Sequence, residues 1–241
     1  MNQLNSSYES SLHGAILGAI ENQFDSSANS QQRYQIVKYL LAETRCNPNV
    51  GLNPLCISVT HDSVYNYTSL LLQYHCHVDR LGWNLQESTN RDYHQIGCRF
   101  PYPLDHPLNI CLRCLMNTTD NSIATGYFSH RQYTRAIISH QANIYAMADY
   151  GSKYPLLLAV QTGDKVLVQS ILEHYQNFIQ FDLCESLIHA CVKSYYDIVQ
   201  LFIDIGFNPN TVVVEGCIER LNNRECAQSM NRTRTNLMIF I

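Results

Sequence analysis

Four residues of the central sequence have the types and spacing of a tetrahedral zinc site. The stretch "HQIGCRF" supplies His94 and Cys98, and "NICLRCL" supplies Cys111 and Cys114. A Cys-x2-Cys pair with a further cysteine and a histidine completes a ligand set that zinc prefers. The second close cysteine pair of a zinc module is missing, however, and cysteine often serves as a small hydrophobic core residue. We therefore favour core positions for Cys111 and Cys114, and keep a zinc- or thiol-dependent hydrolase centred on these four residues as the alternative function.

Other chemistry-bearing residues form weaker patterns. Nucleophilic catalysis needs a cysteine or serine, a positioned histidine and a third orienting group. With ten cysteines and ten histidines, suggestive pairs arise by chance. His75 and His77 in "HCH" lie where a helix is expected to end, which disfavours a metal site. The ten glycines are scattered, so no phosphate-binding loop is predicted. We expect no cofactor and no enzymatic activity.

The sequence repeats itself. Residues 154–172, "YPLLLAVQTGDKVLVQSIL", match residues 185–203, "ESLIHACVKSYYDIVQLFI", position by position. In each copy a leucine is followed three residues later by an alanine and then by two apolar pairs. Weaker copies begin at Ser11, Asn53 and His106. Each copy reads as a short helix, a tight turn, a second helix, a Gly-like terminator and an extended polar loop.

Proline and glycine mark the ends of the expected helices. Pro54, Pro107 and Pro155 stand where the first turn of a helix needs no backbone donor. Gly206 follows an apolar second helix, at a place where a positive φ is often required. Pro209 then prevents the helix from resuming. Because one helix pair cannot bury its apolar stripe alone, neighbouring pairs are expected to complete the core.

These copies resemble ankyrin repeats. The family pattern is T-P-L-H-x-A, then V-V, L-L and G-A-D-V-N. Here it reads "YPLLLA", "LV", "IL" and, from neighbouring copies, "QANIY", "HCHVD" and "GFNPN". The resemblance covers roughly residues 11–210 and implies an all-α ankyrin-repeat solenoid of about five stacked helix-turn-helix units. It also implies that His13, at the histidine of the pattern, hydrogen-bonds the backbone of its loop.

Three places depart from the ankyrin spacing. The leucines that mark successive copies are there separated by more than the family period of about 33 residues. We therefore expect inserted loops near residues 21–33, 80–105 and 115–131. Residues 1–10 are expected to form an N-terminal tail, and residues 211–241 a C-terminal capping helix or partial repeat.

Composition favours a folded protein with a protein partner. Hydrophobic residues make up 46% of the chain and charged residues 15%, which argues against intrinsic disorder. A net charge of −4 argues against a nucleic-acid partner. No segment reaches the about 18 apolar residues of a membrane span, and the opening residues lack the features of a signal peptide. We expect a cytoplasmic protein, with the nucleus as an alternative, that is monomeric on its own.

The resemblance implies a non-enzymatic adaptor or scaffold that binds another protein through its loop tips and the concave face of its first helices. Tips of successive repeats are expected to lie in one row. Tyr39 and Tyr67 fall on second helices and are expected in the core. Counting along the pattern predicts the following partner-binding residues: His77, Asp79, Arg80, Trp83, Asn143, Tyr145, Asp149, Tyr150, Asn208 and Asn210.

Overall fold

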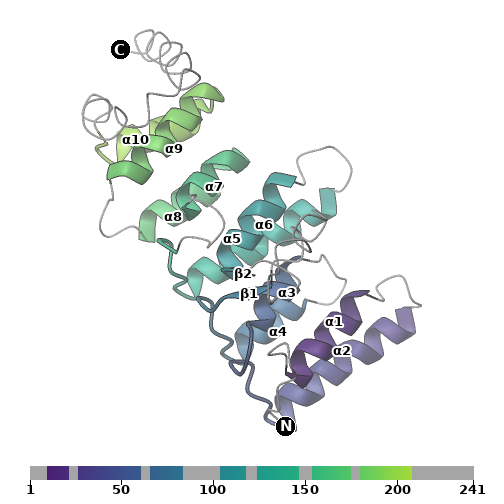
Figure 1. The fold of residues 1–241 in the computed structure, drawn as a ribbon. Coiled ribbons are helices and arrows are strands. Elements are labelled where there is room, and N and C mark those ends of the chain that lie inside the picture. Colours follow the sequence, from purple (N-terminus) through teal and green to yellow (C-terminus); the bar gives the residue numbers. More distant parts are fainter. Residues whose placement is uncertain are drawn as a thin grey trace, which may run out of the picture. The chain divides into compact units, whose positions relative to one another are not determined.

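The computed structural model is built from pairs of helices (Figure 1). Within the residues that the structure describes, ten helices and two short strands are present, so the expected all-α character is confirmed. The chain divides into two compact units, residues 1–152 and 153–241, where the sequence predicted one repeat domain. The described ranges are 10–21, 27–60, 66–83, 104–117, 124–146, 154–174 and 180–207.

The first unit contains three consecutive helix pairs. Each first helix packs on the second helix that follows it, and α3 also contacts α1 and α5, so that the first helices form a row. The second helices α4 and α6 are in contact as well. The bounds are α1 (Ser11–Glu21), α2 (Ser27–Ala42), α3 (Pro54–Thr60), α4 (Tyr67–Gln73), α5 (Pro107–Asn117) and α6 (Ala124–Ser139).

A short antiparallel ribbon lies against α3. Its strands are β1 (Gly82–Trp83) and β2 (Leu104–Asp105), with Gly82 opposite Asp105. A Cβ atom at Gly82 would lie 2.5 Å from the carbonyl oxygen of Asn53 and 2.7 Å from the Cβ atom of Cys56. The close approach of the ribbon to α3 therefore requires glycine at this position.

The second unit repeats the same plan. It consists of α7 (Pro155–Thr162), α8 (Lys165–His174), α9 (Gln180–Val192) and α10 (Tyr196–Asp204). Within this unit α7 contacts α8 and α9, and α10 contacts α8 and α9. The two matching copies of the sequence thus form two similar helix pairs, as predicted. Their marker residues Leu156, Ala159, Leu187 and Ala190 are all buried.

The predicted helix starts are confirmed. Pro54, Pro107 and Pro155 are the first residues of α3, α5 and α7. At this position proline loses no hydrogen bond, and its fixed φ already suits the helix. In α10, Ile198 and Phe202 lie one turn apart and are both buried, whereas Ile203 is 47% exposed, so burial accounts for only part of the apolar block of this helix.

In the described residues, α2, α4, α6 and α10 are each followed within three residues by a residue with positive φ. Gly206 was predicted to have a positive φ and has one of +84°, but Arg45, His75 and Gln141 take the same conformation, with φ of +51°, +58° and +61°. At His75 the backbone N–H donates to Leu72 O at 3.0 Å, the pattern of a Schellman cap. Residues with a Cβ atom are strained in this conformation by about 1 kcal/mol or more.

Two expected loops are partly helical, which corrects the sequence prediction. Residues 27–33 belong to α2 and residues 124–131 belong to α6. The segment "SANSQQR" contains neither proline nor glycine, so nothing stops the helix from extending toward its N-terminus. Residues 115–117 of the third predicted loop belong to α5, and residues 82–83 and 104–105 of the second form β1 and β2. The remaining parts of the tail, insertion and capping predictions, residues 1–9, 22–26, 84–103, 118–123 and 211–241, lie outside the described residues.

The two tyrosines expected in the core have different outcomes. Tyr67 is 4% exposed, and its ring centroid lies 5.5 Å from that of Tyr34 on α2, so this prediction is confirmed. Tyr39 is 59% exposed, so this prediction is wrong. The reason is helical geometry: Val37 and Leu41 carry the buried face of α2, and Tyr39 projects from the opposite side.

Replacing Gln141 with glycine should raise the free energy of unfolding by about 0.5 to 1 kcal/mol, because glycine takes positive φ without strain. Gly206→Ala should lower it by about 1 kcal/mol for the converse reason. The matched control is Gln132→Gly within α6, where the same change should destabilise by about 1 kcal/mol. Urea denaturation measures all three. Equal effects of glycine at positions 141 and 132 would contradict the assigned strain.

Candidate functional site

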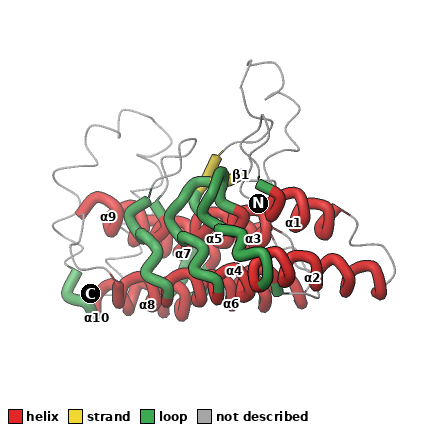
Figure 2. The backbone as a smooth tube through the Cα atoms, turned by 90° about the horizontal axis from the view of Figure 1, so that it is seen from below, coloured by secondary structure: helices red, strands yellow, loops and turns green. Residues whose placement is uncertain are grey.

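Three connecting loops of the first unit lie side by side (Figure 2). They are residues 43–53, 74–81 and 140–146, and each follows a second helix. We call these three loops together the loop edge. Most side chains at their tips are exposed, so the loop edge is the accessible polar surface formed jointly by the three helix pairs.

The same hydrogen bond joins each loop to the next. Asn49 Oδ1 accepts from the backbone N–H of His77 at 2.7 Å, and Asp79 Oδ1 accepts from the backbone N–H of Asn143 at 2.5 Å. Asn49 and Asp79 are the fifth residues of "RCNPN" and "HCHVD", and the two donors are the third residues of the following copies. The Asn49 amide also donates to His75 O at 3.0 Å. Because the acceptors and donors occupy equivalent positions in successive copies, these bonds set the distance between neighbouring loops.

Two further side chains tie the first loop to the second. The guanidinium of Arg80 donates to the carbonyl oxygens of Asn49 and Gly51, at 2.6 Å for Gly51. The buried amide of Asn53 donates to the carbonyl oxygens of His77 and Arg80, both at 2.8 Å. Each bond crosses between loops, so the tip of the second loop is held from both its exposed and its buried side.

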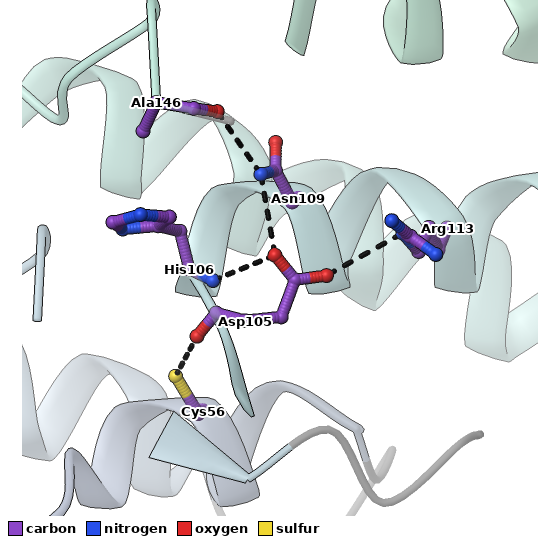
Figure 3. Close-up of polar contacts among 6 residues, drawn as sticks. All are labelled: Cys56, Asp105, His106, Asn109, Arg113 and Ala146. Atoms are coloured by element: carbon purple, nitrogen blue, oxygen red, sulfur yellow. Dashed lines mark hydrogen bonds and ion pairs between the residues drawn. The ribbon is translucent and has the colours of Figure 1, made fainter. Parts of the chain in front are cut away.

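Behind the loop edge lies a buried carboxylate (Figure 3). Asp105 is only 2% exposed, and its Oδ1 accepts from the backbone N–H of His106 at 2.8 Å and from Asn109 Nδ2 at 3.2 Å. Arg113 Nε lies 3.4 Å from Asp105 Oδ2. Burial raises the pKa of the Asp105 carboxyl, while Arg113 and these hydrogen bonds oppose the shift. The group is well paired, and its role is structural.

The carboxylate network connects to the loop edge. Asn109 Nδ2 also donates to Ala146 O at 3.1 Å, and His106 Nδ1 lies 3.0 Å from Asp79 O. On the other side of the network, Cys56 Sγ donates to Asp105 O at 3.3 Å. Burial raises the pKa of the Cys56 thiol well above its usual value. This thiol is therefore a hydrogen-bond donor and not a nucleophile.

His13 is fully buried near the same edge. Its Nδ1 lies 3.4 Å from the backbone N and 3.0 Å from the hydroxyl of Ser10, the residue directly before α1. The predicted bond from His13 to the backbone of its loop stays a prediction. Burial, and to a smaller extent the charge of Arg80, lower the pKa of His13 to about 4, although a hydrogen bond to the Leu52 backbone opposes the shift. The imidazole is therefore neutral at physiological pH.

Half of the predicted partner-binding residues lie on the loop edge, where the structure brings them together in the expected row. The backbone of Trp83 forms part of β1. The remaining four, Asp149, Tyr150, Asn208 and Asn210, lie outside the described residues. Contact with a partner stays a prediction for all ten. The five on the loop edge are His77, Asp79, Arg80, Asn143 and Tyr145.

Sequence reasoning missed the residues that hold this edge together. Asn49 and Asn53 make the cross-loop bonds but were not among the predicted site residues. A signal was present, because Asn49 occupies the same repeat position as Asp79, and Asn53 precedes the proline that starts α3. Asp79 and Arg80 were predicted as partner contacts, and their polar atoms also bond neighbouring loops.

The zinc candidate has two of its four residues in the described part. Cys111 and Cys114 lie on α5 and are buried, and burial raises the pKa of both thiols. His94 and Cys98 lie outside the described residues. Among the described residues, no three histidine, cysteine or acidic side chains are grouped so that they could hold a metal ion, and none of the seven described cysteines forms a disulfide.

No protein-family model and no curated protein matches the chain. None of the helices in the described ranges has the length and apolar character needed to cross a membrane.

Asn49→Ala should lower the free energy of unfolding by about 1 kcal/mol, because it removes the acceptor of His77 N–H and the donor to His75 O. Asn49→Asp keeps the acceptor oxygen and should lower the free energy of unfolding by less than Asn49→Ala does. Asn29→Ala, at an exposed position of α2, is the matched control and should stay within about 0.5 kcal/mol of the wild type. Chemical denaturation measures these values. A loss no larger than that of the control would show that the bond between the loops contributes nothing.

Stability should fall as pH decreases through the range set by His13. Its pKa is about 4 in the folded protein and 6.5 without the fold, so the unfolded chain binds the proton first. The free energy of unfolding should therefore drop between pH 6.5 and about 4, by at most about 3 kcal/mol. His13→Gln should flatten this dependence, whereas His174→Gln, at the exposed end of α8, should leave it unchanged. A wild-type profile that is flat over this range would refute the assignment.

Arg113→Met should destabilise the protein by about 3 kcal/mol or more, because it leaves the buried carboxylate of Asp105 without its cation. Asp105→Asn should destabilise the protein less than Arg113→Met does, since the amide oxygen can still accept from His106 N–H. In the double variant the two losses should not add, because no buried charge is then unpaired. Thermal denaturation of the three variants tests this; strictly additive losses would show that the pair is not coupled.

Proposed function

We propose that this chain is a non-enzymatic protein-binding module built from divergent ankyrin repeats, and that it binds a partner protein through the loop edge. One observation carries the proposal: the same side-chain-to-backbone bond joins successive loops, from Asn49 to His77 and from Asp79 to Asn143. A bond repeated at equivalent positions supports a repeat architecture in which the loops form one surface.

Rigid loops favour binding for a thermodynamic reason. A partner that binds mobile loops must order them, and the lost conformational freedom reduces its affinity. Here Arg80 and Asn53 fasten the second loop to the first, so the loops need little further ordering. The side chains of Arg45 and His77 extend from this fixed backbone and are exposed. Such residues are available for contact with a partner.

Burial shifts the proposed surface away from the first helices. The ankyrin resemblance implies that these helices share in binding, but every residue of α3 is buried, and so are residues 155–160 of α7. Buried side chains can make no contact with a partner. We therefore place the binding surface of the first unit on the loop edge and not on the face of α3.

The alternative function, a zinc- or thiol-dependent hydrolase, needs a reactive thiolate or a thiolate ligand. Burial raises the pKa of both Cys111 and Cys114, which keeps these thiols protonated at neutral pH. Cys111 also sits near Thr134 in the core between α5 and α6, where a hydrogen bond from that side chain reduces the shift. Their chemistry supports a core role, which favours the binding module.

The test is affinity capture with the full chain immobilised and bound proteins quantified by mass spectrometry. A partner should be retained by the wild type and by Gln132→Ala, an exposed change on α6. Its retention should fall at least about tenfold with the double variant Arg45→Ala/His77→Ala. Partners retained equally by all three proteins would contradict binding through the loop edge. Stoichiometric zinc that survives dialysis would instead support the hydrolase.

A further inference from the structure

We draw no further inference here: the strongest candidate, the exposed apolar patch that Ile36 and Tyr39 form on the outer side of α2, carries nothing, because nothing in the structure shows what covers it.

Discussion

The register of the first unit depends on the acceptors of two loop backbone N–H groups, those of His77 and Asn143. In both cases the acceptor is a side-chain oxygen of the preceding loop. Such a bond forms only if two loops from separate helix pairs lie at a fixed separation. The packing of α1, α3 and α5 and the alignment of the loops therefore stabilise each other.

The acceptor position demands a short side chain. Asparagine and aspartate reach a neighbouring backbone N–H because their oxygens lie close to the main chain. In the third loop the equivalent position holds Tyr145, whose hydroxyl is carried on the far side of a ring and cannot make the same short bond.

Local features of the fold were predictable from the sequence, and contacts between distant residues were not. Pro54, Pro107 and Pro155 mark helix starts through their own backbone chemistry, which needs no knowledge of neighbours. The bonds of Asn53 to the carbonyl oxygens of His77 and Arg80 join residues whose proximity only the packed helices create. The alignment of the loop tips could be predicted because each copy of a sequence repeat places its loop beside the loop of the preceding copy.

Two exposed polar residues of the loop edge, Arg45 and His75, occupy positions that glycine would fill more stably. Gly206 ends α10 without strain, whereas Arg45 and His75 take the same positive φ with a Cβ atom present. Each therefore costs about 1 kcal/mol relative to a residue that suits this conformation. In return, both place an exposed polar side chain just after the end of a second helix, beside the bonded loop backbone. A binding surface built on such positions gains fixed orientation, since the helix cap and the loop bonds leave the backbone beneath it little freedom to move.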